Sequence, residues 1–273
     1  MPFSLADVNR VAHELWPLSG AEAWDAPGLV TGDLSQDIRS IHLAVDAVAD
    51  SVDEAIAAGA DLLLVHHPLL LRGVTSIAED RYKGALLSRL IRANCALLAA
   101  HTNADIVTDG VSDTLATRLG LRNARPIVPG ATPDVGLGRV GELSEPVSLG
   151  HLARRLGDLL PATASGVRVA GDYGAMVTRV SLCGGAGDSL LREPAVLGSD
   201  VYITSDLRHH PASESREQSR LTGDTPALID VSHWASEWLW LDGAAEQLRT
   251  ALPGTQVTVS DLRTDPWDFV IMQ

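Results

Sequence analysis

The stretch GADLLLVHHP at residues 59–68 decides the fold of this 273-residue chain. Its apolar run ends at Val65, and a continuous run of this kind is typical of a strand buried on both faces of a parallel sheet. A second such run, CALLAA, occupies residues 95–100. Helix-like segments at 82–93 and 110–119 flank the second run, so strands and helices alternate along the chain. The pattern predicts an α/β fold with mostly parallel sheets.

A proline-rich stretch, NARPIVPGATPDVGL at residues 123–137, separates two predicted lobes. A weak repeat indicates that the lobes are similar, because GSDVYITSDLRHHP at 198–211 again places His-His-Pro after a strand-like segment. We expect residues 1–122 plus 233–273 to form the first α/β lobe and residues 123–232 to form the second. The remaining helices are expected at 5–17, from Ser51, and at 148–160, 187–193 and 233–251, and the remaining strands at 41–48, 138–143, 167–170, 177–183, 200–204, 226–231 and 256–261.

The balance of charges excludes several classes of function. The chain has 21 Lys and Arg against 35 Asp and Glu, a formal net charge of −14, which disfavours a bulk electrostatic grip on nucleic acid. No stretch approaches the roughly 18–20 uncharged apolar residues of a membrane helix, and no secretory signal is visible. Cys95 and Cys183 cannot build a disulfide framework. We therefore expect a cytoplasmic protein with no membrane partner and no nucleic acid on its outer surface.

Three groups of histidine and carboxylate side chains follow predicted strands. In open α/β sheets, ligands gather beyond the carboxyl ends of the strands. We therefore expect the three groups to line a functional cleft. They are His66 and His67 after the strand at 60–65, His101 and Asp105 after the strand at 95–100, and His233 and Glu237 after the strand at 226–231.

The donor types in these groups indicate a metal centre. Imidazole and carboxylate together suit Zn, Mn, Fe, Co or Ni. His233 and Glu237 are four residues apart and share one helix face, so they can reach the same ion. Asp105 and Glu237 could bridge two ions about 3.5 Å apart, as in two-metal hydrolytic sites. The alternative is that some of these side chains are buried and satisfied, or cap helices. We predict two divalent ions per chain, held by His66, His67, Asp105, His233 and Glu237.

Two further segments are candidates for contacts with a small anionic substrate. The glycines at 184–187 follow a predicted strand and precede a predicted helix, where backbone N–H groups can bind an anion. A tight turn with close packing is the alternative. The pair at 209–210 could line the same cleft or simply end a strand. The predicted substrate contacts are Gly184, Gly185, Gly187, His209 and His210.

Several motifs, taken in order along the chain, resemble the signatures of one known family. They are the segment with Trp24, Gly28 and Gly32, then GADLLLVHHPL at 59–69, AHTNAD at 100–105, CGGAG at 183–187, and IDVSH at 229–233 with Ser236 and Glu237. These residues resemble the dinuclear metal-centre family similar to NGG-interacting factor three, a YbgI-like family often named GTP cyclohydrolase type 2-like. The resemblance covers nearly the whole chain. It implies a two-lobed α/β protein that assembles as a toroidal homohexamer, with a metal pair in a cleft between the lobes and the same five ligands that the spacing selects.

Two classes of function follow. In the first, the chain is a metal-dependent hydrolase in which a metal-bound water attacks a nucleotide, a phosphoester or a cyclic amide. His101 is the predicted catalytic residue, because it lies one helical turn from Asp105 and could orient it or move a proton. In the second, a non-catalytic hexamer stores or delivers metal, or serves as an interaction platform. Ligands from three strand ends and a separate anion-binding loop favour the hydrolase.

Overall fold

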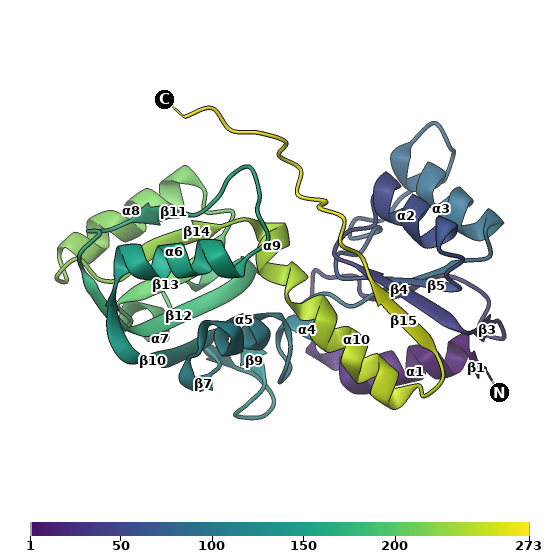
Figure 1. The fold of residues 1–273 in the computed structure, drawn as a ribbon, viewed down its shortest axis with the longest axis horizontal. Helices are drawn as coiled ribbons and strands as arrows, with labels where there is room; N and C mark the ends of the chain where they lie inside the picture. Colours follow the sequence, from purple (N-terminus) through teal and green to yellow (C-terminus); the bar gives the residue numbers. More distant parts are fainter. Residues whose placement is uncertain (1, 273) are drawn as a thin grey trace. The chain divides into compact units, whose positions relative to one another are not determined.

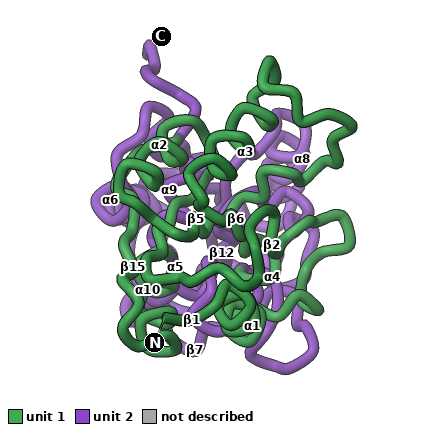
Figure 2. Tube along the Cα trace, turned by 90° about the vertical axis from the view of Figure 1, so that its right-hand side faces the viewer, with its two compact units in different colours: residues 1–104, 241–264 green, residues 105–240, 265–273 purple. Residues whose placement is uncertain are grey.

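The computed structural model describes residues 2–272 and divides them into two compact units. Unit 1 runs to Ala104 and also includes residues 241–264, and unit 2 comprises residues 105–240 and the segment from Asp265 onward (Figure 2). Residues 105–122, residues 233–240 and the segment from Asp265 onward, all expected from the sequence in the first lobe, belong to unit 2. The reason is packing, because α5 (Val111–Leu119) and α9 (His233–Trp238) both contact β12 (Met176–Ala186).

Unit 1 contains a mostly parallel sheet formed by β2 (Gly28–Thr31), β4 (Ser40–Ala44), β5 (Leu62–Val65), β6 (Ala96–Ala99) and β15 (Gln256–Val259). The strand order is β15-β4-β5-β6-β2. The first four strands run parallel to their neighbours, and β2 pairs antiparallel with β6. Every residue of β5 and β6 is buried, as the continuous apolar sequences predict. A short antiparallel pair, β1 (Phe3–Ser4) and β3 (Asp37–Ile38), lies outside this sheet.

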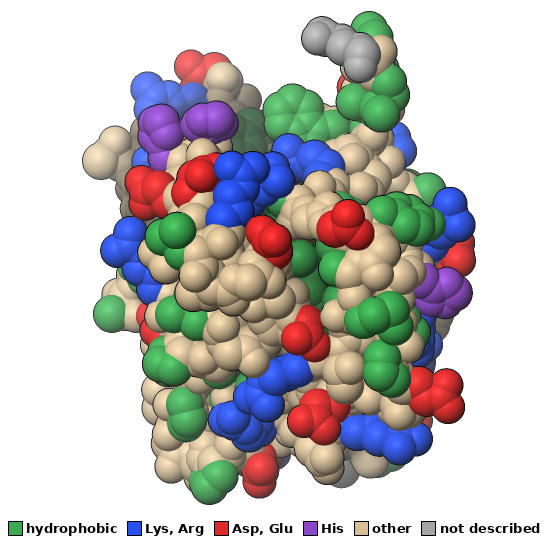
Figure 3. Space-filling model, turned by 90° about the vertical axis from the view of Figure 1, so that its left-hand side faces the viewer, with side chains coloured by type: hydrophobic (Ala, Val, Ile, Leu, Met, Phe, Trp, Pro, Cys, Tyr) green, Lys and Arg blue, Asp and Glu red, His purple; other side chains and the backbone are tan. Residues whose placement is uncertain are grey.

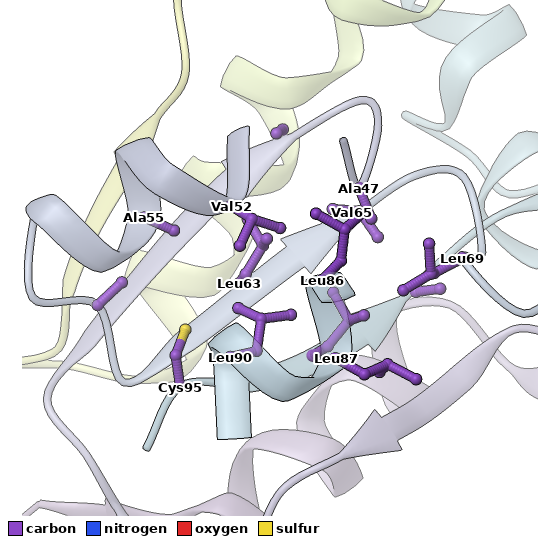
Figure 4. Close-up of a cluster of buried hydrophobic side chains, with 14 residues drawn as sticks. Ala47, Val52, Ala55, Leu63, Val65, Leu69, Leu86, Leu87, Leu90 and Cys95 are labelled. Carbon is purple, nitrogen blue, oxygen red and sulfur yellow. The ribbon is translucent and has the colours of Figure 1, made fainter. Parts of the chain in front are cut away.

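Helices flank the sheet of unit 1. They are α1 (Leu5–Leu15), the 3-10 turn η1 (Leu18–Gly20), α2 (Ala49–Ala57), α3 (Tyr82–Arg92), α4 (Thr102–Asp105) and α10 (Trp240–Ala251). In Figure 1, α2 and α3 lie on one side of the sheet and α1 and α10 on the other. A continuous apolar core lies between β5 and the helices α2 and α3, and it includes Val52, Leu63 and Leu90 (Figure 4).

Helix α2 begins at Ala49, two residues before the predicted start at Ser51. Ser51 Oγ accepts a hydrogen bond from Val48 N–H at 3.1 Å and donates one to the Asp46 carbonyl at 2.6 Å. The serine therefore closes the first turn from inside the helix. This bond also fixes the backbone of Asp46 beyond the end of β4.

Unit 2 contains a mixed sheet formed by β7 (Arg122–Arg125), β10 (Arg139–Ser148), β11 (Arg168–Ala170), β12, β13 (Val201–Ser205) and β14 (Ala227–Val231). The strand order is β11-β14-β13-β12-β10-β7. β12, β13 and β14 run parallel, and the flanking strands pair antiparallel. Within the proline-rich stretch, β8 (Val128–Pro129) and β9 (Gly136–Leu137) form a separate short pair. The predicted α/β class is confirmed; the sheet of unit 1 is mostly parallel as expected, whereas that of unit 2 is mixed, because its outer strands pair antiparallel.

The helices of unit 2 differ from the prediction in three places. The unit contains α5, α6 (Leu149–Leu159), the 3-10 turn η2 (Asp188–Leu190), α7 (Pro194–Leu197), α8 (His209–Arg220) and α9. The helix predicted at 187–193 is wrong, because this segment forms only the 3-10 turn and α7 begins at Pro194. The single helix predicted at 233–251 is two helices, α9 and α10, which are separated at Leu239. Helix α8 was not predicted, since within residues 209–220 only Ser219 is buried and no apolar stripe marks the helix.

Acidic and basic side chains are interspersed on the protein surface, and Figure 3 shows this mixture on one face. In unit 2, Arg168 pairs with Asp230 at 2.7 Å and Arg208 with Asp188 at 2.5 Å. Among residues 2–272, none of the helices combines the length and apolar character that crossing a bilayer requires.

Candidate metal centre

Three predicted site histidines meet in unit 1. His66 and His67 directly follow β5, and His101 follows β6 and Ala100. Because β5 and β6 are parallel neighbours with Val65 opposite Ala99, the residues beyond their carboxyl ends lie side by side. The ring centroids are 5.1 Å apart for His66 and His67, 5.2 Å for His66 and His101, and 5.4 Å for His67 and His101. One ligand atom from each side chain lies within 4.8 Å of the other two, so this group could hold a metal ion.

Each of these three rings uses its Nδ1 atom in a hydrogen bond. The partners are the Ala100 carbonyl at 2.8 Å from His66, Asp46 Oδ1 at 2.6 Å from His67, and Asp25 Oδ1 at 2.7 Å from His101. A carbonyl or an ionised carboxylate only accepts, so Nδ1 is the donor and Nε2 carries the lone pair in the neutral ring. A carboxylate or carbonyl on one ring nitrogen is the arrangement that orients metal-binding histidines and raises their basicity.

The Asp25 carboxylate is the most firmly held of these partners, and its side chain is fully buried. Its Oδ2 accepts from the backbone N–H of Thr102 at 3.0 Å and from the Thr102 hydroxyl at 2.5 Å. Burial raises the pKa of Asp25, but the hydrogen bonds from His101 and Thr102 outweigh it and lower the pKa to about 2. Asp25 is therefore an anion at neutral pH and keeps the Nδ1 proton on His101.

His233 and Glu237 meet in unit 2, on the first turns of α9. Ser232 begins this helix, and its Oγ accepts the Ala235 N–H at 3.2 Å. His233 Nε2 lies 2.9 Å from Glu237 Oε1, so the spacing of four residues brings both donors to one face as predicted. His233 Nδ1 lies 2.8 Å from Asp206 Oδ2. Burial lowers the pKa of His233, but the carboxylates of Glu237 and Asp206 raise it well above its ordinary value.

Gly185 leaves room beside these two donors. Its backbone has φ +70°, a conformation that side chains with a Cβ rarely adopt. A Cβ at this position would overlap Glu237 Oε1 and lie 3.2 Å from His233 Nε2. Glycine therefore keeps open the space in front of the imidazole and the carboxylate, as a bound ion requires. The chemistry of the donors and this space both fit a divalent metal ion.

Asp105 lies at the end of α4 and belongs to unit 2. The negative charge of Asp105 affects the pKa of the Cys183 thiol on β12. Burial raises the pKa of the Cys183 thiol to about 12, and the negative charges of Asp105 and Glu237 act in the same direction. Both predicted carboxylate ligands therefore lie near the same thiol within unit 2.

The glycines predicted to bind an anion have other roles in unit 2. Gly184 and Gly185 lie inside β12 rather than at a helix start. Their N–H groups donate to Ser112 Oγ at 3.2 Å and to Ser236 Oγ at 2.9 Å, respectively. A Cβ on Gly187 would overlap the Tyr202 hydroxyl. These contacts correspond to the alternative of close packing, and anion binding by the three glycines stays a prediction.

His209 and His210 begin α8, with ring centroids 5.3 Å apart. His210 lines a cavity of about 950 Å³ in unit 2, between α8 and the segment of η2 and α7. Arg208, which pairs with Asp188, lies at the same cavity. His209 and His210 therefore start a helix rather than end a strand, and their contact with a substrate remains a prediction.

Sequence reasoning missed the carboxylates that hold the histidines, namely Asp25, Asp46 and Asp206. Their separations along the chain from the histidines they contact are 76, 21 and 27 residues. A local motif does not reveal partners so far apart. Asp46 and Asp206 nevertheless follow the carboxyl ends of β4 and β13, so the rule that selected the histidines could have found them.

Comparisons with known proteins agree with the fold. The sequence profile of Duf34/NIF3 (NGG1p interacting factor 3) matches residues 3–266. A Streptomyces coelicolor protein named GTP cyclohydrolase 1 type 2 homolog is 46% identical over 270 residues, covering 96% of this chain and 93% of the relative. A Bacillus cereus protein related to NIF3 has the same fold, with a TM-score of 0.89 at 22% identity over 99% of this chain and all of the other. A hypothetical protein from Staphylococcus aureus gives a TM-score of 0.87 at 26% identity over the same shares. The chain belongs to the Duf34/NIF3 family.

Proposed function

We propose that this protein binds two divalent metal ions and acts as a metal-dependent hydrolase. The observation that carries the proposal is the bonding of four histidine rings. His66, His67, His101 and His233 each place Nδ1 against a carbonyl or a carboxylate. In the three rings of unit 1, Nδ1 therefore carries the proton of the neutral ring and Nε2 the lone pair, in the arrangement common to metal-binding histidines, and His233 Nε2 lies 2.9 Å from the other proposed ligand of α9, Glu237. The proposed ligands are His66 and His67 of unit 1, and Asp105, His233 and Glu237 of unit 2.

The reaction class follows from the donor set and from the relatives. Divalent ions, when bound, lower the pKa of water and polarise the bond under attack. His101 is proposed to move a proton at Nε2, because Asp25 holds the opposite ring nitrogen at 2.7 Å and favours this tautomer. The name of the Streptomyces relative refers to a GTP cyclohydrolase, so hydrolytic opening of a nucleotide ring is the first reaction to examine. Phosphoesters and cyclic amides are the other substrate classes.

Metal analysis tests the first half of the proposal. After reconstitution with Zn or Mn, elemental analysis of the wild type is expected to give about two ions per chain. His67→Ala and Glu237→Ala should each lose metal. His42→Ala is the matched control, because His42 is also buried and lies 2.9 Å from a carboxylate, that of Glu54, but is not among the side chains within residues 2–272 that could hold a metal ion. Fewer than about one ion per wild-type chain, or equal loss in the control, would refute the metal centre.

A substrate screen tests the second half. Metal-loaded wild type, His67→Ala and His101→Ala should be compared on nucleotides, phosphoesters and cyclic amides. Turnover in the wild type that is lost in both variants supports the hydrolase, provided that His101→Ala retains its metal. Turnover equal in all three proteins indicates a contaminant. No turnover, together with rapid transfer of metal to an acceptor protein, would favour metal delivery instead.

We further propose that the chain forms a homohexamer in the cytoplasm. The assembly is implied by the family, and the compartment is suggested by the free thiols of Cys95 and Cys183. Light scattering on the native protein should give about six times the 28.9 kDa mass of the chain. A monomer at micromolar concentration would contradict the assembly.

A further inference from the structure

An exposed tryptophan stands beside the histidine group of unit 1. Trp24 is 60% exposed, whereas Trp16, in the same unit, is 1% exposed and belongs to the core. The Trp24 and His101 ring centroids are 5.7 Å apart, and the two planes are nearly perpendicular at 79°. Moving a large aromatic side chain out of water lowers the free energy of the system. An aromatic ring exposed next to polar donors is therefore a candidate surface for a ligand.

The turn that carries Trp24 is fixed by hydrogen bonds on both sides of the tryptophan. Before it, Glu22 N–H donates to Thr102 Oγ1 at 3.0 Å, and the Glu22 carbonyl accepts Asp25 N–H at 3.0 Å. After it, the Asp25 carboxylate accepts from Thr102 and His101, and from Ala26 N–H at 2.7 Å. The exposed ring therefore sits on a braced turn that is tied to the same residues that orient His101. Such bracing lowers the entropy lost when a ligand binds.

We propose that Trp24 is the stacking surface for a flat heteroaromatic ring of the substrate, which it holds next to His101. This inference rests on the proposed function and narrows its substrate class. An indole face is complementary to another flat π system, and it carries no positive charge that would select an isolated phosphate group. The ring contact with His101 places such a substrate ring within reach of the proposed proton-transfer group. A purine or pyrimidine nucleotide fits this chemistry better than an aliphatic phosphoester.

Calorimetric titration of the Zn-loaded protein tests the proposal with three probes: GMP, CMP and ribose 5-phosphate, which lacks the ring. The wild type should bind at least one nucleotide more tightly than ribose 5-phosphate. Trp24→Leu should weaken nucleotide binding roughly 5- to 150-fold, the range seen when a base loses its aromatic partner. Trp24→Phe keeps a flat ring and should retain most of the affinity. Ribose 5-phosphate binding should be unchanged in both variants.

The control variant is Trp267→Leu, since Trp267 is 65% exposed but lies in the C-terminal segment of unit 2. It should bind all three probes as the wild type does. The stacking proposal is overturned if the wild type binds no nucleotide more tightly than ribose 5-phosphate, or if Trp24→Leu binds nucleotides as well as the wild type. It is also overturned if Trp24→Leu changes the mass measured by light scattering while nucleotide affinity stays constant, because the ring would then serve assembly. Zinc content, measured on every variant, separates these outcomes from failure of the metal centre.

Discussion

The substitution Asp46→Asn tests whether the carboxylate behind His67 tunes a metal ligand. Asp46 Oδ1 lies 2.6 Å from His67 Nδ1, and its Oδ2 accepts from the Thr264 hydroxyl at 2.5 Å. An asparagine keeps the shape and one acceptor oxygen, and the Thr264 hydroxyl can rotate to accept from the new amide. The bond to His67 then survives but loses its charge, and a charge-assisted hydrogen bond is about twice as strong as a neutral one.

The expected magnitude follows from this bond. Mutation of a carboxylate that orients a metal-binding histidine lowers metal affinity about 10- to 100-fold, or about 1.4–2.7 kcal/mol in binding free energy. Competition with a chromophoric zinc chelator measures the dissociation constant directly. Thermal unfolding of the metal-free protein, recorded in parallel, separates a change in affinity from a change in stability.

Glu54→Gln provides the matched control in the same unit. Glu54 Oε2 lies 2.9 Å from His42 Nε2, and His42 Nδ1 lies 2.9 Å from Thr258 Oγ1, and this histidine is not among the side chains of the described residues that could hold a metal ion. The Glu54→Gln protein should bind zinc like the wild type, even if its stability falls. If both variants lose affinity equally, or if Asp46→Asn loses none, the reasoning that links the bonded Nδ1 atoms to metal binding is wrong.

Three further perturbations have outcomes fixed by the structure. Burial raises the pKa of Cys95 to about 11 and that of Cys183 to about 12, so at pH 8 the folded protein should react slowly with a thiol-specific disulfide reagent; one fast equivalent per chain would contradict this. Gly185→Ala should weaken metal binding at least tenfold, because its Cβ would overlap the Glu237 carboxylate, whereas Gly223→Ala shares the positive φ but meets no atom within 4 Å and should leave metal affinity unchanged. Hydrogen bonds lower the pKa of Asp25 from the ordinary 3.8 to about 2 in the folded state. The ionised carboxylate therefore contributes about 1–2 kcal/mol to the free energy of unfolding, allowing for solvent screening. This contribution is complete above about pH 4 and is lost as the pH falls through about 2. The difference in unfolding free energy between wild type and Asp25→Asn, from urea titrations, should shrink between pH 5 and pH 2, and a constant difference would count against the assignment.

The sequence predicts the helices and strands whose buried apolar residues recur periodically or form a continuous run along the chain. The apolar runs of β5 and β6 identify strands covered on both faces, and the site histidines follow directly from where those runs end. Helix α8 has the opposite character, because its polar residues do not mark a buried face. The break between α9 and α10 falls where the chain passes from unit 2 to unit 1, a boundary set by tertiary packing.

The parts of the candidate site that depend on local spacing can be predicted from the sequence, and those that depend on contacts between distant residues cannot. His233 and Glu237 are found because four residues make one helical turn. The pairing of His101 with Asp25 joins residues 76 apart and depends on how α4 meets the turn at residues 22–26. Such a contact is created by the fold as a whole and leaves no trace in local spacing.

The position of strand β15 late in the chain affects how unit 1 folds during synthesis on the ribosome. It pairs in parallel with β4, so Val257 lies opposite Ile41 although more than 200 residues separate them. All of the contiguous 105–240 segment of unit 2 emerges from the exit tunnel before this strand does. During translation β4 therefore presents an unpaired edge, which is a template for pairing with other nascent chains. We expect the N-terminal unit to complete its sheet only after residues 256–259 have emerged, and truncation before residue 256 to leave a product that aggregates rather than a smaller folded domain.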